Sequence, residues 1–243
     1  MKKILKKIMK EILKKWRKFQ RRNYKKSIKE WELFEDLLGK FETNYDLGNK
    51  SHERNMEIIL KNLNNRVVLK GEHFSFNQTV GERKLERGFK EGPIVIRGQM
   101  TKGLAGGICQ VSSTLYNAIL VSNLKIKERK HHPRIQKYVP EGRDATVYFD
   151  LIDLVFKNNR KSPIKLKTKI DKVKGIIVFE IWGRNIENIN VEIKTTKKET
   201  KKYSIFKTYR EVYKGEKLIK KERISKDKYK RVWYLENKKD TLK

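Results

Sequence analysis

Hydrophobic positions at the start of the chain follow the spacing of a helix. Apolar side chains recur three or four residues apart over Ile4–Phe19, and Lys or Arg fills most of the places between them. This pattern predicts an amphipathic helix. Further apolar positions over Trp31–Leu37 extend it to Gly39, where we expect it to end. Residues 1–40 are therefore predicted to be a basic amphipathic helical region.

A second helix is predicted over Ser51–Asn62, and short apolar runs punctuated by glycine then indicate strands. The predicted strands are Val67–Leu69, Phe74–Phe76, Gly92–Ile96, Ala145–Phe149, Leu154–Phe156, Ile164–Ile170 and Ile176–Trp182, with a hairpin turn over Asp171–Gly175 between the last two. Residues 51–185 are assigned to one domain. Residues 186–243 form a basic C-terminal extension with a predicted β-hairpin turning at Lys214-Gly215.

One stretch combines glycines with the only cysteine of the chain. Gly106 and Gly107 precede Cys109, and the apolar spacing that follows predicts a helix with Cys109 in its first turn. Unpaired amides and the positive end of the helix dipole lower a thiol pKa there. The glycines let a substrate backbone approach, and their amides with the Gln110 side chain could form an oxyanion hole.

A nucleophilic cysteine needs a base, and the chain has four histidines. His131 and His132 follow the cysteine helix, and Asp144 or Asp153 could orient such a histidine in Cys-His-Asp fashion. Arg143 precedes a predicted strand and could bind a substrate carboxylate. Against this, a lone cysteine is more often a small core residue than a nucleophile. The residues alone leave both roles open.

The composition shows that the chain is strongly basic. The formal net charge is +32, and residues 1–29 hold 14 Lys or Arg against the single acid Glu11. Such a helix suits an anionic membrane surface, but it could also pack on the following domain with its lysines in water. The excess of Lys over Arg is also what codon bias in an AT-rich genome produces. We expect no cofactor, and one cysteine excludes a disulfide framework or a Cys-based zinc site within one chain.

The chain from Phe74 to Ile164 resembles the VanW family of bacteria. Ala105, where the family usually has glycine, and Pro133, where it usually has serine, depart from its pattern. The blocks that carry the resemblance are, in order, Phe74-Ser75-Phe76-Asn77, Val80-Gly81-Glu82-Arg83, Gly88-Phe89, Gly106-Gly107-Ile108-Cys109-Gln110-Val111-Ser112-Ser113-Thr114-Leu115-Tyr116-Asn117, Glu128-Arg129, His132, Tyr138-Val139-Pro140, Gly142-Arg143-Asp144-Ala145-Thr146-Val147, Asp153, Phe156-Lys157-Asn158 and Pro163-Ile164.

The resemblance implies a role near peptidoglycan or glycopeptide resistance. Some VanW domains are regarded as L,D-transpeptidases in which the signature cysteine is the nucleophile. Carried over, Cys109 attacks a stem peptide and His132 moves the proton. Gly106, Gly107, Gln110 and Arg143 are the expected substrate-binding residues, and Cys109, His132, Asp144 and Asp153 the candidate catalytic ones.

From these observations we expect an α+β fold in which the Cys-bearing helix packs on an antiparallel sheet. The leading function is thiol acyl transfer or peptide hydrolysis on peptidoglycan stem peptides or precursors. The alternative is a non-catalytic accessory or binding protein at the membrane, bound through residues 1–29. A nucleic-acid-binding module is a weaker alternative because no recognition motif is present. No signal peptide or transmembrane helix is expected. We expect a peripheral position at a bacterial membrane, and the sequence leaves its side open.

Overall fold

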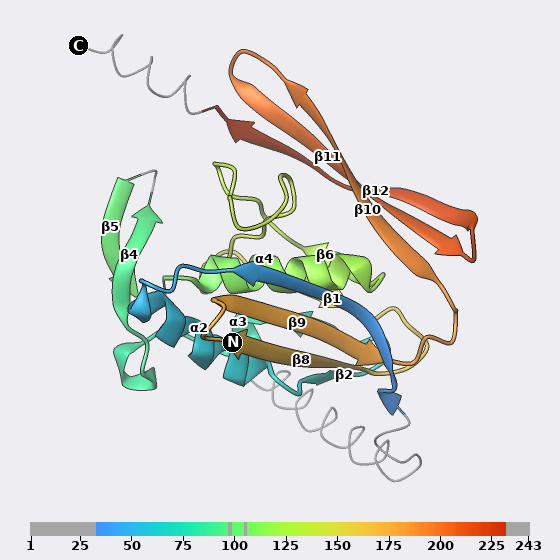
Figure 1. The fold of residues 1–243 in the computed structure, drawn as a ribbon, viewed down its shortest axis with the longest axis horizontal. Coiled ribbons are helices and arrows are strands. Elements are labelled where there is room, and N and C mark those ends of the chain that lie inside the picture. Colours follow the sequence, from blue (N-terminus) through green and yellow to red (C-terminus); the bar gives the residue numbers. More distant parts are fainter. Residues whose placement is uncertain (1–32, 97–98, 105, 232–243) are drawn as a thin grey trace, which may run out of the picture.

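The computed structural model describes residues 33–96, 99–104 and 106–231 of the chain (Figure 1). Most of the predicted helical region 1–40, and the membrane assignment of residues 1–29, lie outside this range. The elements are, in order, β1 (Asp36–Asn44), α2 (Lys50–Leu63), β2 (Val67–Val68), β3 (His73–Ser75), α3 (Phe76–Val80), the 3-10 helix η2 (Leu85–Arg87), β4 (Glu91–Ile96), β5 (Gln99–Leu104), α4 (Ile108–Val121), β6 (Lys125–Glu128), β7 (Val155–Lys157), β8 (Ile164–Asp171), β9 (Ile176–Gly183), β10 (Asn190–Glu199), β11 (Tyr203–Lys214) and β12 (Lys217–Lys230).

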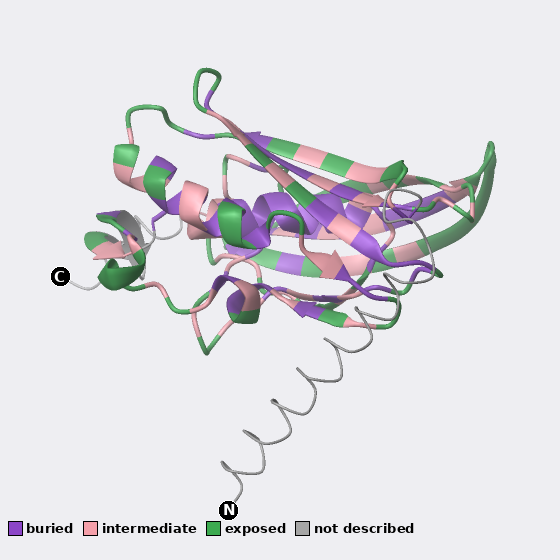
Figure 2. Cartoon of the chain, turned by 90° about the horizontal axis from the view of Figure 1, so that it is seen from below, coloured by how far each residue is buried: buried purple, intermediate pink, exposed green. Residues whose placement is uncertain are grey.

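Helix α4 is the central element. Every residue from Val111 to Leu120 is buried, and Figure 2 shows the helix enclosed along its length. It contacts β1 and β9, and also α2, β6 and β10. A helix surrounded in this way takes its stability from packing more than from intrinsic propensity. In the part of the chain that the structure describes, no helix has the length and apolar character to cross a membrane.

The strands form antiparallel sheets, in the orders β1-β9-β8-β2, β10-β11-β12, β3-β7-β6 and β4-β5. This confirms a mixed fold built on antiparallel sheets. The predicted turn over Asp171–Gly175 joins β8 to β9. The Asp171 carboxylate there accepts from the Val173 and Lys174 amides at 3.0 Å, and Gly175 takes the left-handed conformation at φ +65°.

The predicted helix over residues 1–40 is wrong at its C-terminal end, because β1 begins at Asp36 and pairs with β9. Gly39 does not end a helix. A Cβ atom on it would lie 2.4 Å from Ser122 Oγ and 2.8 Å from Val121 Cγ2, so glycine allows β1 to lie against the end of α4. Helical spacing in a short apolar run is a weak signal, and tertiary pairing overrides it here.

Two other predictions need correction. Residues Ala145–Phe149 form only isolated bridges, from Thr146 to Lys130 and from Tyr148 to Ile152, and not a strand. Strand β3 ends at Ser75 because the Ser75 hydroxyl accepts from the Gln78 amide at 3.0 Å and caps α3. The described part of the C-terminal extension, residues 186–231, contains a three-stranded sheet, since β10 pairs with β11 beside the β11–β12 hairpin.

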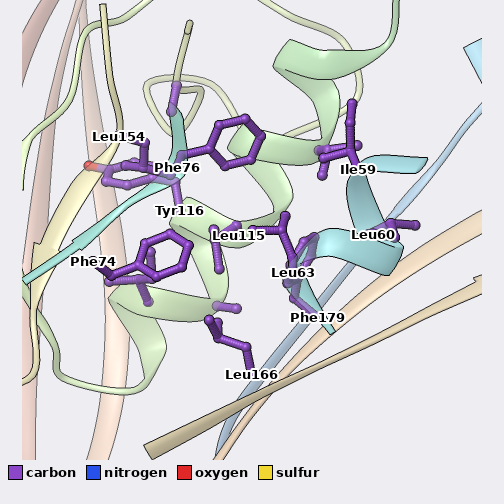
Figure 3. Packing of buried hydrophobic residues seen from close by; sticks show 14 of the residues in the cluster. Ile59, Leu60, Leu63, Phe74, Phe76, Leu115, Tyr116, Leu154, Leu166 and Phe179 are labelled. Carbon is purple, nitrogen blue, oxygen red and sulfur yellow. The ribbon is translucent and has the colours of Figure 1, made fainter. Parts of the chain in front are cut away.

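A single buried cluster connects the layers around α4 (Figure 3). Phe74 and Phe156 stack with ring centroids 4.9 Å apart. Each such side chain contributes roughly 1.5–3 kcal/mol on full burial. The labelled members are Ile59, Leu60, Leu63, Phe74, Phe76, Leu115, Tyr116, Leu154, Leu166 and Phe179. This core holds the first turn of α4 in place.

Candidate active site

Cys109 is the second residue of α4, so it lies where amides lack intrahelical acceptors. Gly107 caps the helix in the left-handed conformation, at φ +90°. A Cβ on Gly106 would lie 2.2 Å from His52 Nε2, and one on Gly107 would lie 2.8 Å from Met56 Cε. The two glycines therefore allow α4 to begin close against α2. Their predicted role in binding substrate stays a prediction.

The Cys109 sulfur faces the irregular segment that replaces the predicted strand. It lies 3.5 Å from Thr146 Oγ1, and the thiol donates to the Val147 carbonyl at 3.6 Å. Side chains of α4 hold this segment: the Ser112 hydroxyl donates to the Ala145 carbonyl at 2.7 Å, and the Ala145 amide donates to Ser113 Oγ at 2.9 Å. These bonds occupy the amide and carbonyl of Ala145, and the segment makes only isolated bridges at Thr146 and Tyr148 before it turns at Phe149.

His132 is bound by Asp144 and influences the Cys109 thiol. Its Nδ1 lies 2.5 Å from Asp144 Oδ2, and its backbone amide donates to the same oxygen at 2.7 Å. A proton on Nδ1 directed at the carboxylate leaves Nε2 for the sulfur. Of the two acids that the sequence left open, the structure places Asp144 at the imidazole.

The pKa shifts describe an ion pair. Burial raises the pKa of the Cys109 thiol, but hydrogen bonding to His132 and the positive charge of its imidazole, with smaller contributions from Val147 and Thr146, bring it below its usual value. Burial lowers the pKa of His132, whereas hydrogen bonds to Asp144 and Cys109 and their charges raise it to about 9. The lowered pKa of the thiol and the raised pKa of the imidazole both favour a thiolate beside an imidazolium.

Asp144 is itself held by residues far away in the sequence. It is almost completely buried, and the Tyr229 hydroxyl from β12 donates to its Oδ1. Arg129 donates to the Asp144 carbonyl at 2.6 Å and to Asp227 Oδ2, also from β12, at 2.6 Å. Burial raises the pKa of Asp144, and its bonds to His132 and Tyr229 with the charge of Arg129 lower it below its usual value.

Sequence reasoning missed these supporting residues. Asp227 and Tyr229 are two positions apart, so they lie on one face of β12, and both are buried. The sequence did contain a signal for this buried face, because an acid and an aromatic residue stand two positions apart in a strand otherwise rich in lysine. Tyr138 was also missed as a site residue: burial, and then the negative charge of Cys109, raise its pKa well above the usual value.

Three predicted site residues have partners elsewhere. Asp153 accepts from the Ser75 hydroxyl and, at 2.9 Å, from the Asn77 amide at the start of α3. The Gln110 side chain donates to the Asn44 carbonyl of β1 at 2.7 Å. The structure does not bring either side chain to the sulfur, so their predicted catalytic and substrate-binding roles rest on the sequence.

Arg143 is the third of these residues. Its Nε donates to Asn117 Oδ1 at 2.6 Å, and its guanidinium lies 5.3 Å from the Phe41 ring centroid. Asn117 is two helical turns beyond Cys109 on α4. Binding of a substrate carboxylate by Arg143 stays a prediction.

Comparison with known proteins places these residues in a family. A family model described as VanW like protein matches residues 51–182. The chain is 40% identical over 151 residues to the uncharacterized protein YoaR of Bacillus subtilis (strain 168), a match covering 62% of this chain and 49% of YoaR. It is 31% identical over 129 residues to the vancomycin B-type resistance protein VanW of Enterococcus faecalis (strain ATCC 700802 / V583), covering 50% of this chain and 46% of that protein.

The chain thus spans about half the length of these curated relatives, and no solved structure matches it. The matched range 51–182 is more than half of the 243 residues and contains Cys109, His132 and Asp144. The chain therefore belongs to the VanW family.

Proposed function

We propose that this protein is a thiol acyltransferase or peptidase of the L,D-transpeptidase type, acting on peptidoglycan stem peptides or their precursors. The observation that carries the proposal is the order Cys109–His132–Asp144, with a lowered thiol pKa at the first turn of a buried helix. The family link to vancomycin resistance, through the name of the Enterococcus faecalis relative, implies a cell-wall-related role. The family link supports a cell-wall role only, and the choice of a peptide as the substrate is part of the proposal.

The reaction begins with the Cys109 thiolate attacking the carbonyl carbon of a peptide bond between an L and a D residue. The oxyanion that forms accepts hydrogen bonds from amides at the start of α4. His132 gives its Nε2 proton to the leaving amine, the C–N bond breaks, and a thioester remains on Cys109. Asp144 holds the Nδ1 proton throughout, which keeps Nε2 directed at the reaction.

The second half releases the acyl group. An acceptor amine, or water in hydrolysis, loses a proton to His132 Nε2 and attacks the thioester carbonyl. The C–S bond then breaks, and the thiolate–imidazolium pair returns. The choice between amine and water decides between transpeptidase and peptidase.

The test is incubation of the full chain with a stem-type tetrapeptide that has an L-to-D bond before its last residue, with and without an amine acceptor. We expect mass spectrometry to show the shortened or exchanged peptide and an acyl adduct on Cys109, both absent from Cys109→Ala. Arg54→Gln, a change at an exposed ion pair with Glu57, is the matched control. Binding of the peptide with no product and no adduct would instead assign the protein to the non-catalytic accessory class.

A further inference from the structure

Arg83 is a charged residue next to the site that the chemistry above does not use. It is partly buried in the loop after α3, and its Nη2 donates to Asn77 Oδ1 at 2.7 Å. The guanidinium carbon lies 5.5 Å from the Phe149 ring centroid and 5.9 Å from that of Phe76. Two aromatic faces therefore flank the cation.

The rest of the guanidinium is unsatisfied. Arg83 Nε and Nη1 are shielded from solvent, and neither has a hydrogen-bond partner in the structure. A buried donor without an acceptor costs free energy, and native proteins retain few of them without a functional reason. Arginine at such a place commonly binds a carboxylate or phosphate.

The segment that contacts Cys109 also leads to Arg83. Val147 accepts from the Cys109 thiol, and Phe149, two residues later, packs on the Arg83 guanidinium. Burial lowers the pKa of Arg83 to about 10, with the negative charge of Cys109 opposing that change ahead of Asp153. Arg83 therefore carries a positive charge at neutral pH.

We propose that Arg83 binds the free C-terminal carboxylate of the peptide substrate, so that Cys109 acts on the last peptide bond of the stem. This rests on the proposed function and names the end of the substrate that the site takes. In any peptide, the α-carboxylate is the anion that stays within one residue of the final peptide bond. A cation next to the nucleophile selects that bond over internal ones.

Phe149, whose ring lies 5.5 Å from the Arg83 guanidinium carbon, belongs to a turn at the surface. The neighbouring residues of that turn, Tyr148 and Leu151, are 61% and 76% exposed. A side chain in an exposed turn moves more readily than one in the core. A carboxylate that displaces the Phe149 ring reaches the two unsatisfied nitrogen atoms.

The experiment compares two stem-type tetrapeptides that differ only in ending as a carboxylate or as an amide. Their dissociation constants are measured by calorimetry on full-length Cys109→Ala protein, with and without Arg83→Gln. A charge-assisted pair predicts about 10- to 100-fold tighter binding of the acid. Arg83→Gln should bring the ratio near one, Arg83→Lys should retain part of it, and Arg54→Gln should leave it unchanged.

Equal binding of the two peptides, or a preference that survives Arg83→Gln, would overturn the assignment. Should Arg83→Gln fail to fold in circular dichroism, the Arg83→Lys comparison decides the same question, because it keeps the charge and loses the planar fork. Turnover by the wild-type protein tests the proposed function separately. Acid-selective binding without turnover would sustain the Arg83 site and refute the enzyme.

Discussion

His132 is the residue through which the site acts on Cys109. Its Nδ1 lies 2.5 Å from Asp144 Oδ2, and its hydrogen bonding and positive charge lower the pKa of the Cys109 thiol, which favours the thiolate. The sequence, with its family resemblance, predicted the pairing of Cys109 with His132. The choice between Asp144 and Asp153 could not be predicted, because Asp153 is bound by Ser75 and Asn77, more than 70 positions earlier in the chain.

At the scale of single residues, replacing Asp144 with asparagine should narrow the pH range over which the protein is active. The imidazolium is needed to protonate the leaving amine, so activity falls as pH rises through the His132 pKa of about 9. Without the carboxylate charge, the fall in activity on the alkaline side should move toward the ordinary histidine pKa of about 6.5. The measurement is kcat/KM against pH. Asp153→Asn is the control and should leave that fall in place; an equal shift in both variants would remove Asp144 from its assigned role.

At the scale of elements, the β8–β9 hairpin could be predicted from the sequence, whereas strands β10 and β1 could not. The β8–β9 hairpin is local, and its turn residues are visible in the sequence. Strand β10 has no fully buried position, and only Val191 and Ile193 alternate with polar residues, which is too short a pattern to predict a ten-residue strand. Strand β1 has helical apolar spacing, and only its pairing with β9 makes it a strand.

Gly39→Ala tests whether residue 39 lies in strand β1 or inside a helix that continues past it. In a helix, alanine would stabilise by about 1 kcal/mol. In β1 the new methyl group meets Ser122 and Val121, which should cost about 1–3 kcal/mol of unfolding free energy in urea denaturation. A stabilised variant would contradict the strand.

Tyr229→Phe tests the contribution of β12 to the site. Loss of the hydroxyl leaves one Asp144 oxygen without its buried donor, so we expect a loss of about 1–3 kcal/mol in stability. With less support for Asp144, kcat should fall more than KM changes, and the alkaline limb should shift. Tyr209→Phe on β11, where Lys221 lies over the ring, is the matched control. If kcat and the pH profile stay at wild-type values while stability drops, Tyr229 is only a packing residue.

At the scale of the whole molecule, the structure extends beyond the residues that the family model matches. Strand β1 precedes residue 51 and joins the four-stranded sheet, while β12 follows residue 182 and supplies Tyr229 and Asp227. Sequence blocks of the family identify the central chemistry. They carry no information on flanking strands, whose contacts depend on long-range packing.

The charge of the whole chain, +32, supports a separate prediction for residues 1–29. We propose that they bind an anionic membrane surface, each Lys or Arg near it contributing about 1 kcal/mol. Vesicle sedimentation should show binding to anionic vesicles that weakens as salt rises, and little binding to zwitterionic ones. Undiminished binding after deletion of residues 1–29 would move the membrane contact elsewhere.

The ion pair at Cys109 is the central claim, and the chain offers a clean measurement because Cys109 is its only cysteine. The rate of alkylation by iodoacetamide, followed against pH by intact mass, reports the pKa of that thiol alone. The structure predicts an apparent pKa below the usual value of about 8.5, rising in His132→Gln as the imidazolium charge is lost. A wild-type thiol that titrates at or above about 8.5, unchanged by His132→Gln, would contradict the nucleophile and with it the catalytic account.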